Sequence, residues 1–189
     1  MTNWVRNWVL ILILMSSNAY AGLMIEDSFF YDISSVTSSG TDTHSRIFDS
    51  FFAGSTFAHS FFIGWNMSYA TRSAALGGNT SILNGYEMGP KIGMFLNKGQ
   101  TLLLAVALNP LVRSTSTLVS GAVQSWSGMG AQGEIAYSPQ IGKHTFIGVK
   151  LIFDYVSYTQ STDSSNLTSS VSYSSPVLMP TIYWSLRFD

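Results

Sequence analysis

Hydrophobic and polar residues alternate along residues 145–158, which read "TFIGVKLIFDYVSY". In a strand, every second side chain lies on the same face. One phase of this segment is uncharged and consists of Thr145, Ile147, Val149, Leu151, Phe153 and Tyr155. The other phase carries Lys150 and Asp154. These two would also share a face in a helix, but Gly148 and the many β-branched and aromatic residues favour a strand. We therefore predict a strand with one continuous hydrophobic face and one mixed face.

The same alternation is found in further segments of the chain. It is clear in residues 61–72, 86–96, 101–113, 128–137 and 175–188. It is less clean near the start, where Asp27 falls on the hydrophobic phase. It is ambiguous in "RIFDSFFAG", where we place Asp49 on the inner phase.

Connections between the predicted strands alternate between short turns and longer polar loops. The short turns are expected at residues 58–60, 97–100 and 141–144. The longer loops, rich in Ser and Thr, cover residues 34–45, 75–81, 114–125 and 160–172. Both chain ends then lie on the side of the short turns, which is the asymmetry of outer-membrane barrels. The pattern predicts an all-β fold, an eight-stranded antiparallel transmembrane up-and-down β-barrel.

Most charged residues fall on the mixed phase of the predicted strands. They are Glu26, Asp32, Asp49, Arg72, Glu87, Lys91, Arg113, Glu134, Lys150, Asp154 and Arg187. An antiparallel sandwich would also alternate, but its solvent face would carry many more charges than this. A charge that faces lipid near the midplane costs about 2 to 4 kcal/mol. We therefore expect these side chains to form a charge network inside the barrel.

The turn at residues 141–144 predicts one specific ion pair. If Gln140 lies opposite His144, counting along both strands places Glu134 opposite Lys150. Opposite residues have Cβ atoms about 4.5 to 5.5 Å apart, which is within reach of a salt bridge. Asp154 would then pair with a second base across the interior, Lys91 or Arg113.

The first residues are typical of a secretory signal peptide. Arg6 precedes a short hydrophobic core at Val9–Met15, and Ala19–Ala21 forms a small-x-small cleavage site. The alternative is an uncleaved anchor, but a bilayer-spanning helix needs about 20 apolar residues, and this core is shorter. We expect a cleaved signal peptide at residues 1–21 and the barrel at residues 22–189.

The composition agrees with a membrane barrel. Charged residues make up 10% of the chain, against about 25% in typical soluble domains. No apolar run after the leader is long enough for a spanning helix, the longest being Leu102–Leu108, which leaves a closed barrel as the way to cross a bilayer. Without Arg6 the chain has eight bases and ten acids, so we expect no nucleic-acid partner. Cysteine is absent, which excludes a disulfide framework.

Prolines are the main objection to this fold, because every strand of a closed barrel has two neighbours and proline lacks the N–H group. Pro90 and Pro180 lie inside predicted strands, whereas Pro110, Pro139 and Pro176 lie near strand ends. β-Bulges would accommodate them.

The closing stretch "TIYWSLRF" alternates Ile182, Trp184, Leu186 and Phe188 toward an aromatic end. With the leader, the strand count and the alternation, it resembles the small eight-stranded outer-membrane barrels of Gram-negative bacteria. Asp189 departs from that pattern, because such chains usually end on the aromatic residue. The resemblance implies export to the outer membrane, contact with its lipids, and recognition of the last strand by the barrel-assembly machinery. We expect a monomer.

The sequence contains no metal motif and indicates no cofactor. The histidines, His44, His59 and His144, are scattered among the connections. Some outer-membrane barrels are lipid hydrolases or acyltransferases, so His44 beside Ser45 is a candidate pair. Adjacent side chains of a strand point apart, however, and the His-x-Ser spacing of the lipid-A deacylase type is absent. We expect no catalytic residues.

The first function hypothesis is therefore a non-enzymatic structural or adhesive envelope protein. The alternatives are a narrow, porin-like channel for small or apolar solutes and a lipid-modifying enzyme. Eight strands leave an interior that side chains can fill, and the balanced inward charges do not form the ring of one sign expected of an ion-selective pore.

Aromatic belts are expected where the barrel wall meets the lipid head groups. We assign Tyr31, Tyr69, Tyr86 and Tyr155 to the outer belt and Tyr137, Trp184 and Phe188 to the inner belt.

Overall fold

The computed structural model of the chain describes residues 21–37, 41–58, 60–76, 79–117 and 121–188. The expected signal peptide lies outside the described residues except for Ala21, so its cleavage stays a prediction. Within the described ranges, no helix is long and apolar enough to cross a bilayer.

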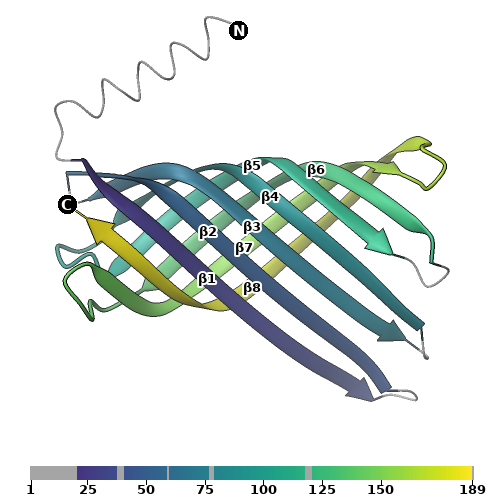
Figure 1. Ribbon diagram of the computed structural model, residues 1–189, viewed down its shortest axis with the longest axis horizontal. Helices are drawn as coiled ribbons and strands as arrows, with labels where there is room; N and C mark the ends of the chain where they lie inside the picture. The colour runs from purple at the N-terminus through teal and green to yellow at the C-terminus, as the bar shows by residue number, and fades with distance from the viewer. Residues whose placement is uncertain (1–20, 38–40, 59, 77–78, 118–120, 189) are drawn as a thin grey trace, which may run out of the picture.

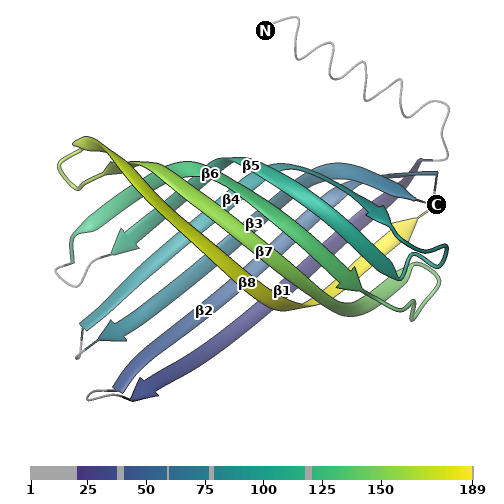
Figure 2. The same ribbon diagram turned by 180° about the vertical axis from the view of Figure 1, so that it is seen from behind.

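Eight antiparallel strands form a closed up-and-down barrel, in which each strand pairs with its neighbours in the sequence and β8 pairs with β1 (Figures 1 and 2). The strands are β1 (Ala21–Thr37), β2 (Thr41–Phe57), β3 (Phe61–Leu76), β4 (Asn79–Phe95), β5 (Leu102–Thr117), β6 (Val123–Tyr137), β7 (Thr145–Thr162) and β8 (Thr168–Phe188). The predicted fold class is confirmed.

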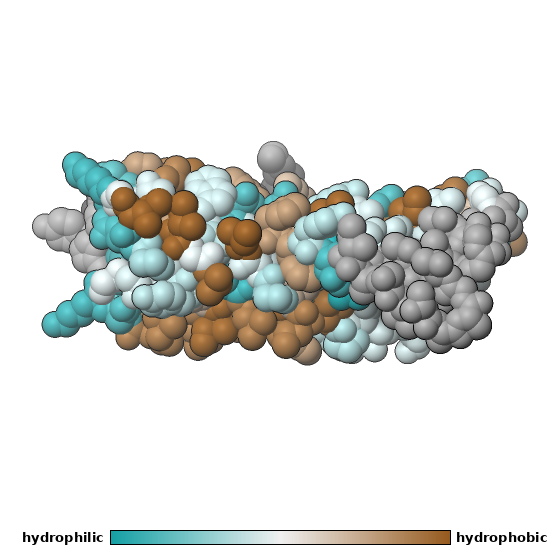
Figure 3. Space-filling view, turned by 90° about the horizontal axis from the view of Figure 1, so that it is seen from below, coloured by the Kyte–Doolittle hydropathy of each residue, from teal (hydrophilic) through white to brown (hydrophobic). Residues whose placement is uncertain are grey.

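Period-two alternation is visible in the burial of each strand. Along β7, Ile152 and Asp154 are buried whereas Leu151 and Phe153 are exposed. On the face shown in Figure 3, hydrophobic residues cover much of the wall in the half of the barrel that carries the short turns, with hydrophilic residues at its tip. The described residues toward the other end are mostly hydrophilic. The barrel therefore has a hydrophobic outer wall and a polar interior.

The Ser- and Thr-rich segments differ from the prediction. Most of each expected loop belongs to the strands, and the described hairpins continue to Thr37, Thr117 and Thr162. Threonine is β-branched and fits a pleated ladder, so the polar composition reflects a change of surroundings along continuous strands. The short turns lie close to their predicted positions, at the end of the barrel where β1 begins and β8 ends (Figure 1).

Two prolines coincide with β-bulges. The register shifts between Met88 and Lys91, around Pro90, and between Asn109 and Val112, around Pro110. In β5, Pro110 and Leu111 both face outward, so the alternation changes phase at this point. Val112 is consequently buried and Arg113 exposed. The expectation that Arg113 lies inside was wrong, because a bulge inserts one residue and reverses every later position.

Candidate functional site

The inner half of the barrel interior contains four charged side chains in mutual contact. Lys150 Nζ lies 2.8 Å from Glu26 Oε1 and 3.0 Å from Glu134 Oε2. Lys91 Nζ lies 2.6 Å from Glu134 Oε2 and also pairs with Glu26 Oε1. All four residues are at most 2% exposed. We call Glu26, Lys91, Glu134 and Lys150 the ion cluster.

Aromatic rings surround the ion cluster. Lys91 Nζ lies 5.0 Å from the centroid of Phe52, and Lys150 Nζ lies 4.3 Å from that of Tyr183. The Tyr183 hydroxyl donates to Glu26 Oε2 at 3.2 Å. Two acids and two bases balance, and the ring faces attract the cations. The low dielectric around the cluster makes the loss of any one member costly.

The ion pair between Glu134 and Lys150 is present, but in another register than the one predicted. Glu134 lies opposite Ile152, and Lys150 lies opposite Ala136. The cause is the turn, where Gln140 pairs with Phe146 and not with His144. The two charged side chains therefore meet diagonally across neighbouring strands.

Arg187 fills the barrel interior between the ion cluster and the end that carries the short turns. Its guanidinium lies between the rings of Phe95 and Phe146, at 4.6 and 3.9 Å from their centroids. Nη1 donates to the carbonyl of Gln100, and Nη2 donates to Ser138 Oγ at 3.2 Å and to Tyr183 Oη at 3.0 Å. We call Arg187 and the buried rings around it the inner plug.

Uncharged amides form a layer above the ion cluster. Asn66 Nδ2 donates to Gln132 Oε1 at 3.0 Å. Gln132 Nε2 donates to Ser68 Oγ at 2.9 Å and to Asp154 Oδ1 at 3.2 Å. The partner of Asp154 is thus an amide, not the predicted Lys91 or Arg113. Lys91 belongs to the ion cluster, and Arg113 lies on the outer wall.

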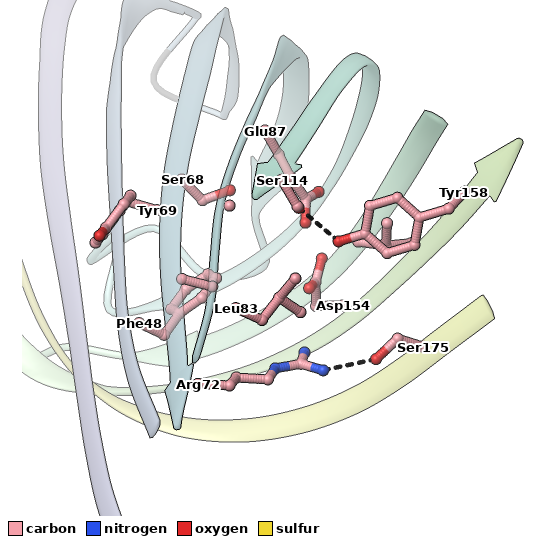
Figure 4. A pocket seen from close by; sticks show the side chains of 13 residues that line it. Phe48, Ser68, Tyr69, Arg72, Leu83, Glu87, Ser114, Asp154, Tyr158 and Ser175 are labelled. Carbon is pink, nitrogen blue, oxygen red and sulfur yellow. Dashed lines mark hydrogen bonds between the residues drawn. The ribbon is translucent and has the colours of Figure 1, made fainter. Parts of the chain in front are cut away.

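A small cavity of about 20 Å³ lies above the amide layer (Figure 4). Glu87 and Asp154 point toward it, and Asn109 Nδ2 donates to Glu87 Oε2 at 2.8 Å. Arg72 Nη1 donates to Ser175 Oγ at 2.7 Å, and the hydroxyls of Ser114 and Tyr158 are 2.7 Å apart. This volume is about that of one water molecule, so the cavity has no room for a larger solute.

Most of the predicted interior charges lie inside the barrel. Glu26, Glu87, Lys91, Glu134, Lys150, Asp154 and Arg187 are buried, and Asp32 and Arg72 are half-buried on the inner phase. Asp49 is exposed on the outer wall, so its assignment was wrong. Phe48 and Phe52 occupy the interior instead, because their rings fill its width. The sequence did not show which phase of β2 faces inward, because aromatic residues occur on both phases.

Several interior residues were not singled out in the sequence. Asn66, Gln132 and Tyr183 are buried at the centre of the interior contacts. The alternation places these residues on the inner phase, but only the charged side chains of that phase were predicted to form the interior network. Arg46 was also missed, and the register places it opposite Asp32 and Arg72.

The belt residues all face outward. Tyr31, Tyr69, Tyr86, Tyr155, Tyr137, Trp184 and Phe188 are 37 to 56% exposed. Tyr69 and Tyr86 lie opposite each other on β3 and β4. Trp184 Nε1 donates to Asp27 Oδ2 at 3.0 Å on the same surface. Their depths in a bilayer stay a prediction.

The histidines form no described constellation with a nucleophile. His59 and the side chain of His44 lie outside the described residues. The hydroxyls of Ser45 and Ser73 are 2.7 Å apart. His144 Nδ1 lies 3.0 Å from the carbonyl oxygen of Arg187, and its ring stacks on Phe188. The described part of the chain contains no group of three or more acidic, histidine or cysteine residues that could hold a metal.

Comparison with known proteins gives structural likeness only. No family model and no curated protein sequence matches the chain. Neisserial surface protein A aligns with a TM-score of 0.48 and 14% identity, over 89% of this chain and 97% of that one. The translocator domain of the autotransporter NalP from Neisseria meningitidis aligns with a TM-score of 0.48 and 10% identity, over 95% of this chain and 67% of that one. The β-domain of the Bordetella autotransporter BrkA aligns with a TM-score of 0.36 and 10% identity, over 91% of this chain and 100% of that one.

The fold and the distribution of side chains carry the conclusion. The strands close on themselves, the outer wall is hydrophobic, and the charges of the inner half are paired inside. Only helices and closed barrels satisfy their backbone hydrogen bonds in lipid. The chain is a small eight-stranded β-barrel with the hydrophobic outer wall of an integral membrane protein.

Proposed function

We propose that this protein is a non-conducting, non-enzymatic envelope protein that presents the far ends of its hairpins outside the membrane, in a structural or adhesive role. The observation that carries the proposal is the filled inner half of the interior. The ion cluster and the inner plug occupy successive levels there, and Lys91, Lys150 and Tyr183 are at most 2% exposed. Ions have no wide polar path past these side chains.

The charge of the interior argues against an ion channel. An ion-selective pore carries a ring of one sign that mobile ions approach. In the ion cluster each lysine already contacts both carboxylates. These carboxylates are held in ion pairs and not arranged around a substrate-sized space, which also supports a role other than catalysis.

The length of the strands supports a role outside the membrane. About 9 to 11 residues of a tilted strand span a bilayer, whereas the strands here have 15 to 21 residues. The hairpins therefore continue past the membrane as a Ser- and Thr-rich extension. Such an extension offers hydroxyl groups and backbone edges to other molecules of the envelope or the cell surface.

Conductance in planar bilayers tests the proposal. We expect the refolded protein to show no conductance steps, because the interior is filled. A variant that shortens the inner plug and one aromatic neighbour, Arg187→Ala with Phe52→Ala, should show steps if the plug is what blocks the path. Steady, ion-selective steps in the unmodified protein would establish the channel alternative, and hydrolysis of added phospholipid would establish the enzyme alternative.

A further inference from the structure

A cavity of about 390 Å³ lies at the end of the barrel that carries the short turns. The turn between β4 and β5 contributes Lys98, and the connection between β6 and β7 contributes Lys143 and His144. Arg187 of β8 borders the cavity from the interior. None of the described residues that line it is acidic. We call this cavity the basic mouth.

Hydrogen bonds within both connections fix the backbone that carries the two lysines. Asn97 Oδ1 accepts from two backbone N–H groups at the far end of its own turn, at 2.9 and 3.0 Å. In the other connection, Gln140 Nε2 donates to the carbonyl of Lys143 at 2.9 Å. The backbone therefore holds Lys98 and Lys143 at the rim of the basic mouth before any ligand binds.

The two rim lysines have no acidic partner. Lys98 and Lys143 are exposed, and within the described ranges neither forms an ion pair. Charges of one sign that line a concave surface raise the local concentration of the opposite ion. The basic mouth therefore attracts anions. Exposed lysines are commonly just solvated, so the buried side of the cavity is the more informative one.

Arg187 is a buried cation on that side of the cavity. It is 3% exposed, and its Nη atoms donate to one carbonyl and two hydroxyl oxygens. Its Nε has no hydrogen-bond partner, and no carboxylate of the described residues forms an ion pair with the guanidinium. A buried charge that lacks a counter-ion is costly. The guanidinium therefore favours an anion in the adjoining cavity.

The sum of the charges in the inner half of the barrel has the same consequence. The ion cluster is balanced, with two acids and two bases. Arg187 adds a base between the ion cluster and the basic mouth, so three buried bases face two buried acids in the described part of this half. An anion in the basic mouth balances this excess and also pairs with the lysines at the rim.

We propose that the basic mouth binds a phosphate group. Phosphate offers negative charge and several acceptor oxygens, and charged donors form short, strong hydrogen bonds to it. Lys98 and Lys143 contact its oxygens from two turns, and Arg187 adds its charge from the interior. Free phosphate and the head group of an anionic lipid at the rim offer the same chemistry. The site lies at the opposite end of the barrel from the hairpin extension, so it does not depend on the adhesive role proposed above.

A phosphate titration followed by NMR tests this proposal. The protein is refolded in nanodiscs of phosphatidylcholine, and inorganic phosphate replaces chloride at constant ionic strength. We expect saturable shifts of the backbone amides of Gly99 and Lys143, and no shift at Thr162, which ends β7 at the far end of the barrel. A second arm adds phosphatidylglycerol to the nanodiscs without free phosphate. The same shifts in that arm would identify the lipid head group as the source of the phosphate.

Variants of the rim lysines separate this site from a general attraction of anions to the protein. Lys98→Gln with Lys143→Gln should weaken phosphate binding by about fivefold, measured at Gly99, because two exposed ion pairs are lost. Lys143→Gln alone should weaken it by about twofold. Arg113→Gln is the matched control for the single variant, because it removes one positive charge from the outer wall and should leave phosphate binding unchanged.

Three results would overturn the proposal. The first is the absence of a saturable shift with both sources of phosphate. The second is a shift that the double lysine variant does not weaken. The third concerns Asp189, the acid nearest to Arg187 in the sequence, which lies outside the described residues. If phosphate binds only to an Asp189→Asn variant, an acid of the chain itself occupies the basic mouth.

Discussion

At the scale of single residues, the ion cluster is the feature whose energetics can be tested most directly. Lys150→Met should lower the free energy of unfolding by about 3 kcal/mol, because it leaves two buried carboxylates with Lys91 alone. Adding Glu134→Gln restores a balance of one acid and one base, so the double variant should regain part of that loss. Unfolding in urea, followed by tryptophan fluorescence in vesicles, measures both changes.

The control for this cycle is Lys98→Met, which removes an exposed lysine from the turn between β4 and β5. We expect it to change the stability by no more than about 0.5 kcal/mol. If the effects of Lys150→Met and Glu134→Gln simply add, the two side chains are not coupled, and the ion cluster does not stabilise the barrel as described.

At the scale of the element, the bulge in β5 decides where Arg113 points. The structure places Arg113 opposite Tyr86 of the outer belt, where its guanidinium can reach the lipid head groups. The absence of native cysteine allows single spin labels at Arg113→Cys and Ser114→Cys. The label at position 113 should be far more accessible to oxygen dissolved in the bilayer, because it faces lipid, whereas Ser114 is buried. The reverse order would show that the phase does not change at Pro110.

Bulges and turns also explain which parts of this structure could not be predicted from the sequence. Alternation is a local signal, so it identified the eight strands and, except in β2, the inner face wherever a strand is unbroken. It failed beyond Pro110, because one inserted residue reverses the phase. It gave the right partner for Lys150, Glu134, but the wrong register for the two strands, because register depends on turn geometry. The sequence also did not predict that the β1–β8 ladder ends at Phe29 and Ile182, because this depends on the register between the first and last strands.

At the scale of the whole molecule, the belts define how the barrel sits in the bilayer. On β7 the exposed hydrophobic side chains begin at Ile147, which lies opposite Trp184 of β8. The indole of Trp184 donates to Asp27, and a carboxylate is far less costly at the interface than at the midplane. Both observations favour the inner interface as the level of Trp184.

Depth-dependent quenching tests this placement. Trp65 and Trp126 are replaced by phenylalanine, which leaves Trp184 as the sole tryptophan of residues 22–189. Phospholipids brominated near the head group should then quench its fluorescence more strongly than those brominated near the chain ends. The matched variant keeps Trp65, which is exposed midway between Phe61 and Tyr69 of β3, and should show the opposite order. If deep bromines quench Trp184 as strongly as Trp65, Trp184 does not lie at the inner interface, and the inner belt lies at Phe188.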